Sequence, residues 1–253
     1  MAAAQLPSLP AQSESIASYR IEAELEPTTK FIRATEVLVW RNTSDVSVSD
    51  FHFHLYLNAY KNNRSTYALE QGGIPGEFDA AADGLWGFCR VDRIRLLAGN
   101  GEQLQDLTAA LQYVQPDDGN VDDQTVFRIP VERAVLPGET ARFEIRFTSR
   151  LPPAVGRSGY TRDFFFVAQW YPKIGVWVDG RWNCHQFHAD SEFFADFGSY
   201  DVRLTVPAGF QIGATGRQLS RVLTGEKVTY RFQQDDVHDF AWAASPDFRL
   251  HNT

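Results

Sequence analysis

Residues 19–26 of this chain read Tyr-Arg-Ile-Glu-Ala-Glu-Leu-Glu, so that apolar and charged side chains alternate along the segment. Because successive side chains of a β-strand point to opposite faces, this period of two predicts a strand with one buried and one solvated face. After a turn at 27–30, residues 31–40 are rich in β-branched and aromatic side chains and predict a second strand beside the first.

The same signals recur along the chain. Residues 51–57, Phe-His-Phe-His-Leu-Tyr-Leu, alternate so strictly that His52 and His54 should share one face of a third strand. No segment shows helical periodicity over three turns. The sequence therefore predicts an all-β fold, a β-sandwich or stacked sheets of many short strands with no substantial helix. Further strands are expected at 91–97, 110–114, 125–129, 141–148, 164–169, 174–178, 200–206, 211–215, 227–232 and 239–244.

The predicted domain organisation is simple. Residues 1–17 are small and polar and should form a flexible lead-in, followed by a single β domain over 18–250. Residues 60–88 are rich in Gly, Asn and Ala and predict a long irregular loop. The lead-in resembles what remains after a small-residue cleavage site, which points to a secreted or periplasmic protein, with a cytoplasmic location as the alternative.

Composition excludes several classes of function. The net charge is -8 and no basic run exceeds a pair, which argues against a nucleic-acid partner. No apolar run approaches the roughly 18–20 residues of a membrane span. The two cysteines, Cys89 and Cys184, could be bridged or free, and their spacing fits no zinc motif.

The densest set of possible metal ligands is His185, His188, Asp190 and Glu192. A spacing of three between the histidines converges on a helix, but none is expected here, so a hydrogen-bonded loop is the favoured interpretation. The pair His52 and His54 could bind a metal only with a third ligand, and an exposed strand face explains it better. We therefore predict no metal site and no catalytic residue in the chain.

Residues 168–177 are the least ordinary stretch: Ala-Gln-Trp-Tyr-Pro-Lys-Ile-Gly-Val-Trp, followed by Trp182 and later Glu192-Phe193. A plain core strand does not require Gln-Trp-Tyr-Pro. This stretch, in order with the other motifs of the chain, resembles the amino-terminal, saddle-shaped β domain of the aminopeptidase N family of zinc metallopeptidases (gluzincins), in its bacterial branch. The other motifs lie at 19–21, 37–44, 53–58, 136–139, 143–147, 200–202, 206–207, 214–216 and 237–246.

The resemblance implies a substrate-flanking, non-catalytic domain of a zinc-dependent aminopeptidase, which removes residues from peptide N-termini. In the family a thermolysin-like domain with the zinc site follows the β domain, so we expect that domain, and the zinc cofactor, beyond residue 253. None of the six histidines is followed by Glu, so the chain lacks His-Glu-x-x-His, and Met1 is its sole methionine, which excludes a Gly-x-Met-Glu-Asn strand. We expect the isolated chain to be inactive.

The resemblance also assigns a site. In the family a Gln or Glu before the Pro-containing turn helps to bind the free amino terminus of the substrate, and Gln169 occupies that place. Trp170 and Tyr171 are expected to line a pocket or to contact the catalytic domain in cis. The usual family pattern has an Arg and a Cys-x-Asp after the Gln, whereas this chain has Lys173 and Val178-Asp179.

Two other functions fit the same sequence. One is a stand-alone β-sandwich binding module, in which the aromatic residues at 170, 171, 177 and 182 stack on sugars or contact a protein, and aspartate pairs hold calcium. The other is a peptidase-like scaffold domain of a membrane-associated protein. A His-Glu-x-x-His motif encoded downstream would discriminate the aminopeptidase hypothesis from both.

Overall fold

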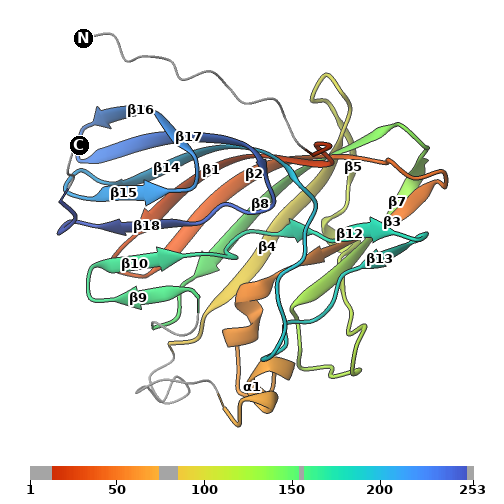
Figure 1. The fold of residues 1–253 in the computed structure, drawn as a ribbon, viewed down its shortest axis with the longest axis horizontal. Helices are drawn as coiled ribbons and strands as arrows, with labels where there is room; N and C mark the ends of the chain where they lie inside the picture. The colour runs from red at the N-terminus through yellow and green to blue at the C-terminus, as the bar shows by residue number, and fades with distance from the viewer. Residues whose placement is uncertain (1–12, 74–84, 154–156, 250–253) are drawn as a thin grey trace.

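Strands dominate the structure, as the alternating sequence predicts. The computed structural model describes residues 13–73, 85–153 and 157–249 (Figure 1). Strand content is 53% and helix content 6%, which confirms the all-β prediction. The helical segments are short: η1 (Tyr56–Tyr60), α1 (Thr66–Glu70) and η2 (Thr108–Ala110).

The largest sheet has eight strands in the order β16-β17-β14-β1-β2-β8-β4-β5. The predicted first hairpin lies at its centre, with Tyr19 opposite Leu38 and Ala23 opposite Ala34. β1 also pairs in parallel with β14, so that segments from the two ends of the sequence lie side by side. The strands are β1 (Ala17–Glu26), β2 (Phe31–Arg41), β4 (Phe88–Leu97), β5 (Gln103–Asp106), β8 (Thr140–Arg150), β14 (Gly198–Pro207), β16 (Arg217–Thr224) and β17 (Lys227–Val237).

Three smaller sheets complete the fold. The first has the order β15-β18-β10-β9 and lies across the strands of the large sheet in Figure 1. The second has the order β11-β3-β7-β6, and the third is the hairpin β12-β13. Their strands are β3 (Val48–His54), β6 (Gln112–Tyr113), β7 (Val126–Val135), β9 (Gly159–Thr161), β10 (Phe164–Val167), β11 (Lys173–Ile174), β12 (Val176–Val178), β13 (Arg181–Asn183), β15 (Gln211–Ala214) and β18 (Trp242–Ser245).

The core lies between the large sheet and the smaller ones. On β10, Phe165 and Val167 are fully buried, whereas the alternate residues Phe164 and Phe166 are 38% and 41% exposed. This alternation is what a sheet with one buried face requires. Aromatic rings fill much of the space, as in the stacked pair Phe53 and Phe127, whose centroids are 4.9 Å apart.

Among the buried polar groups without a partner in the described residues, Glu36 is the one that carries an acidic group. Glu36 on β2 is fully buried among the apolar side chains, and neither of its carboxylate oxygens accepts a hydrogen bond from the described residues. Burial raises the pKa of Glu36 well above its ordinary value, because the charged form loses its hydration. The carboxyl is therefore held in its neutral form over a wide range of pH.

The third predicted strand ends earlier than its alternation suggests. β3 stops at His54, and Tyr56 and Leu57 belong to the 3-10 turn η1. Asn58 holds this turn, because its side chain donates to the carbonyl of Gln124 at 2.8 Å and accepts from the backbone N–H of Cys89 at 2.9 Å. These contacts come from segments far away in sequence, so the alternating pattern could not report them.

Residues 60–88 also contain structure that the sequence did not predict. The helix α1 begins after Ser65, whose hydroxyl accepts from the backbone N–H of Ala68 at 3.2 Å as an N-cap. The remainder of the predicted loop at 74–84 lies outside the described residues, as do most of the lead-in and residues 250–253.

The structure shows the state of the two cysteines and the length of the helices. Cys89 and Cys184 are both buried and both free. None of the helices in the described part of the chain is long and apolar enough to span a membrane.

Candidate functional site

The backbone at Gln169 departs from the predicted strand. β10 ends at Val167, and Gln169 has a φ of +55°, in the left-handed region that costs a non-glycine residue roughly 1 kcal/mol or more. Buried hydrogen bonds hold the neighbouring residues: the backbone N–H of Ala168 donates to Ser158 Oγ at 2.9 Å, and Ser149 Oγ donates to the carbonyl of Trp170 at 2.7 Å. The strain at Gln169 is therefore imposed by its surroundings.

Asp239 is the centre to which this segment is attached. Gln169 Nε2 donates to Oδ2 of Asp239, and Tyr171 Oη donates to Oδ1 at 2.9 Å. Lys173 Nζ forms an ion pair with the same Oδ1 at 2.9 Å. The three residues occupy alternate positions in the sequence, and the left-handed turn at Gln169 lets its side chain reach the same carboxylate as Tyr171 and Lys173.

Lys173 is almost completely buried, with 1% of its side chain exposed. Its ammonium also donates to the carbonyl of His238 at 3.1 Å. Burial lowers the pKa of Lys173, and the nearby Asp239 carboxylate opposes that shift. The ion pair thus neutralises a carboxylate that would otherwise sit beside Gln169 without a countercharge.

The amide oxygen of Gln169 has no hydrogen-bond partner among the described residues, although the residue is only 9% exposed. Its orientation is fixed, because an amide turned the other way would place its oxygen against the Asp239 carboxylate. Gln169 lines a small cavity of about 10 Å³, room for about one water molecule. The other lining residues are mainly aromatic or apolar: Tyr56, Leu57, Tyr60, Arg157, Ser158, Ala168, Phe187 and Phe193.

Trp170 and Tyr171 have positions that differ from our expectation. Both are fully buried, at 0% and 1% exposure, and neither lines the small cavity at Gln169. Trp170 Nε1 donates to the carbonyl of Phe240 at 3.1 Å, and Tyr171 Oη, whose one proton goes to Asp239, accepts from the hydroxyl of Tyr200 at 3.0 Å. Their role here is to anchor residues 168–173, the Gln169 segment, in the core.

The histidine-rich segment forms an ion-pair network. His185 Nδ1 lies 2.5 Å from Asp117 Oδ1, and His188 lies 3.1 Å from Asp117 and 2.7 Å from Glu70. Glu192 instead pairs with Arg157 at 3.0 Å. No group of three or more His, Cys, Asp or Glu side chains in the described part of the chain could hold a metal ion.

The pair His52 and His54 is split between two environments. His52 Nε2 lies 3.5 Å from Asp50 Oδ2, whereas His54 is buried, and burial lowers its pKa to about 3. His54 is therefore neutral under ordinary conditions. The interpretation of both histidines as an exposed strand face is wrong for His54, and His52 is only partly exposed.

His188 should make stability depend on pH. Burial lowers its pKa, but hydrogen bonds to Glu70 and Asp117 raise it more, so the pKa lies above the ordinary value. Its contribution is fully present below the unfolded-state pKa of about 6.5 and is lost as pH rises through the folded-state pKa. We expect His188→Gln to cost about 1 kcal/mol at pH 5.5 and less at pH 8.5, measured by urea denaturation. An equal cost at both values would contradict the assignment.

Comparison with solved structures identifies the fold. A point mutant of the M1 zinc metallopeptidase from Deinococcus radiodurans aligns with a TM-score of 0.55 and 15% identity, over 95% of this chain and 44% of that chain. The unmutated enzyme aligns with a TM-score of 0.55 and 14% identity, over 93% and 43%. A mutant bound to a Tyr-Ser-Ala substrate gives 0.53 and 14%, over 95% and 44%. No protein-family model and no curated protein sequence matches.

The chain has the fold of part of an M1 zinc metallopeptidase. It spans less than half the length of the M1 structures that it matches. The fold is the one that the resemblance implies. At 14–15% identity the likeness shows the fold, and the roles of individual residues rest on the geometry of this chain.

Sequence reasoning found Gln169 in this M1 fold but missed its partners. Lys173 was noted as a departure from the family pattern and Asp239 as part of a motif, and neither was linked to Gln169. The spacing of Gln169 and Lys173 is the signal that could have linked these two residues. Positions 169, 171 and 173 are polar or polar-tipped and alternate with Trp170 and Pro172. Asp239 lies 70 residues from Gln169 and could be placed only by the structure.

Proposed function

We propose that this chain is the amino-terminal, substrate-flanking domain of a zinc-dependent aminopeptidase, with Gln169 as a ligand for the free amino terminus of the peptide. The observation that carries the proposal is the buried amide oxygen of Gln169, oriented by Asp239 and without a partner among the described residues. The shared fold with M1 zinc metallopeptidases supports a peptidase-related domain.

The chemistry of the site suits a primary ammonium group. A neutral amide can accept a hydrogen bond from an ammonium through its oxygen while its N–H group donates elsewhere. Here Asp239 takes that second bond, and Lys173 balances the charge of Asp239. Because the cavity at Gln169 holds no more than about one water molecule, a substrate must displace the nearby aromatic side chains or draw the amide outward.

The zinc ion belongs to the domain that we expect beyond residue 253. The described residues of this chain do not provide a donor set for it. When bound, zinc in such a domain would activate water and polarise the scissile carbonyl. The present chain would contribute binding and orientation of the amino terminus.

The catalytic domain in cis would need a surface on which to dock, and Trp170 and Tyr171 do not offer one. Exposed aromatic side chains on β10 and on the segment between β13 and β14 are better candidates, because exposed apolar side chains can mark interaction surfaces. They are Phe164, Phe166, Phe194 and Phe197, which are 38–52% exposed.

The proposal predicts a selective kinetic defect. In the full-length protein, Gln169→Ala should raise KM for peptides with a free amino terminus by about 10- to 100-fold, the effect of losing one hydrogen bond to a charged group. Gln169→Glu should also weaken binding, because its carboxylate cannot donate to Asp239 and would be repelled by it. Initial rates measured with aminoacyl-anilides over a range of concentrations would give KM and kcat for each variant.

Gln186→Ala provides a matched control. Gln186 is another buried glutamine, but its amide N–H groups bond to Thr66 and Asp118 within the chain, and Asp117 N–H donates to its oxygen. The KM of the Gln186→Ala enzyme should remain close to that of the wild type, provided that the variant is folded. An unchanged KM in Gln169→Ala would refute the proposed role of Gln169.

The structure gives less support to a carbohydrate-binding module. Two of the four aromatic residues expected to stack on sugars, Trp170 and Tyr171, are buried in the core. Trp177 and Trp182 contact each other with ring centroids 5.2 Å apart and donate to Ser44 and to the carbonyl of Asp50. The aminopeptidase domain is therefore the function that we favour.

A further inference from the structure

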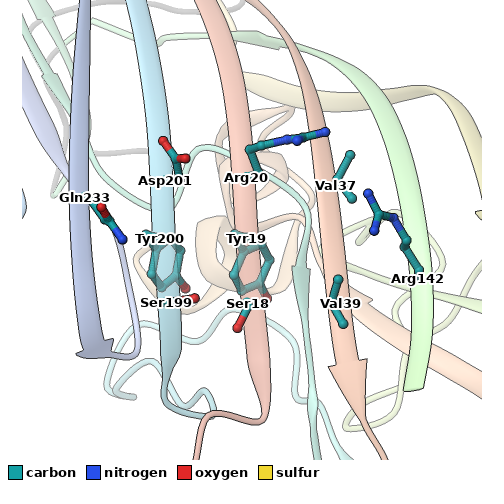
Figure 2. A pocket seen from close by; sticks show the side chains of 10 residues that line it. All are labelled: Ser18, Tyr19, Arg20, Val37, Val39, Arg142, Ser199, Tyr200, Asp201 and Gln233. Carbon is teal, nitrogen blue, oxygen red and sulfur yellow. The ribbon is translucent and has the colours of Figure 1, made fainter. Parts of the chain in front are cut away.

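The face of the large sheet that points away from the smaller sheets carries a hollow of about 210 Å³ (Figure 2). It lies over β1, β2, β8, β14 and β17, on the side opposite to the aromatic core. Val37 and Val39 provide an apolar floor, and polar side chains surround them. The lining residues are Ser18, Tyr19, Arg20, Val37, Val39, Arg142, Ser199, Tyr200, Asp201 and Gln233.

Two guanidinium groups converge on this floor. Arg20 lies opposite Val37 in the register of β1 and β2, and Arg142 lies opposite Val39 in the register of β2 and β8. Both side chains extend toward Val37 in Figure 2, and both line the same hollow. The strand geometry allows this, because a diagonal separation of roughly 12 Å between the two Cα atoms is within the combined reach of two arginines.

Neither guanidinium group is bonded to an acidic side chain within the described part of the chain, and the interaction of Arg20 with Asp201 is electrostatic only. The structure shows no side-chain hydrogen bond or ion pair of Arg20 or Arg142 there, and the Nε atom of Arg142 is buried without a partner. Because this Nε atom is closed to solvent, an acceptor from outside would have to bind the terminal Nη groups of Arg142.

The acidic groups nearby are already engaged. Asp201, the neighbour of Arg20 on β14, makes two hydrogen bonds to Arg231, at 2.9 and 2.8 Å. Glu144, which follows Arg142 on the same face of β8, is paired with Arg95. The hollow therefore contains two guanidinium groups with no hydrogen-bonded carboxylate among the described residues, because Asp201, the carboxylate of its lining, is bonded to Arg231 and interacts with Arg20 only electrostatically.

We propose that this hollow binds a small multivalent oxyanion, a phosphate group or a dicarboxylate, between Arg20 and Arg142. Planar guanidinium groups bind such oxygens through paired N–H donors, and the hydroxyls of Ser18 and Ser199 at the same site can donate as well. The site lies on the opposite side of the large sheet from the Gln169 segment, and the proposal does not depend on the proposed peptidase function.

The test uses the chain itself with inorganic phosphate and with succinate as probes. Sodium chloride at matched ionic strength serves as the control for screening. We expect saturable binding of at least one probe by calorimetry, and a shift of the Arg142 Nε–Hε NMR signal with the same midpoint. The probe that binds more tightly tells a phosphate site from a carboxylate site.

Variants assign the binding to the two arginines. Arg20→Gln and Arg142→Gln should each weaken binding by at least tenfold, whereas Arg146→Gln should not. Arg146 is matched, because it lies on the same strand and face as Arg142 but lines a different hollow. Binding that does not saturate, or an equal loss in Arg146→Gln, would overturn the proposal. The NMR shift in the wild-type chain decides the matter if a variant fails to fold.

Discussion

Replacing Lys173 with methionine should lower the free energy of unfolding of this chain by about 3 kcal/mol. Removal of one partner of a buried ion pair leaves the other charge without compensation, and such changes typically cost about 3–5 kcal/mol. We place the effect at the lower end because the side chain of Asp239 is 17% exposed, so water can solvate part of its charge. Urea denaturation of the wild-type and variant chains at pH 7 measures the difference.

The double variant Lys173→Met with Asp239→Asn is the control. Because it removes both charges together, it should be more stable than Lys173→Met alone. A loss below about 1 kcal/mol in the single variant would show that the ion pair does not hold the Gln169 segment.

Replacing Glu36 with methionine should instead stabilise the chain at neutral pH, by on the order of 1–3 kcal/mol, the cost of burying a polar group without a partner. The carboxyl is buried without a partner among the described residues, and burial raises its folded-state pKa well above the ordinary value. Stability is fully retained below the unfolded-state pKa of about 4.3 and falls by about 1.4 kcal/mol for each pH unit above it, until the folded-state pKa is reached. Methionine has a similar size and carries no charge to lose.

The decisive observation for Glu36 is how the difference in unfolding free energy between the wild type and Glu36→Met changes with pH. Wild type and Glu36→Met should have more similar stability at pH 4 than at pH 7, since contributions from all other groups cancel in the comparison. Chemical denaturation at pH 4, 5.5 and 7 measures this trend. A difference that does not change with pH, or a variant that is less stable at pH 7, would contradict the assignment of a neutral buried Glu36.

The sequence predicted the strands that bury one face. β1 and β2 alternate clearly and form the expected hairpin, because burial of every second side chain is encoded locally. β16 was not predicted, since all eight of its residues are exposed and its sequence, Arg-Gln-Leu-Ser-Arg-Val-Leu-Thr, has no such alternation. It is held at the edge of the sheet by its pairing with β17.

The candidate site was predicted less completely than the fold. Gln169 was identified through a resemblance, and its buried, partnerless oxygen is compatible with that assignment. Trp170 and Tyr171 were expected at a pocket or an interface, because an aromatic ring with a polar tip suits a surface as well as a core. Their burial depends on contacts with Phe147, Tyr200 and Trp242, which no local pattern reveals.

The coding sequence downstream of residue 253 tests the central claim most directly. Our account predicts that the reading frame continues into a domain with His-Glu-x-x-His on a helix and a further Glu ligand, so that the two histidines face one zinc ion. Gln169 would then be the residue to change in the full-length enzyme. A stop codon directly after Thr253, or membrane spans in place of that motif, would contradict the aminopeptidase assignment and leave a binding or scaffold domain with the same fold.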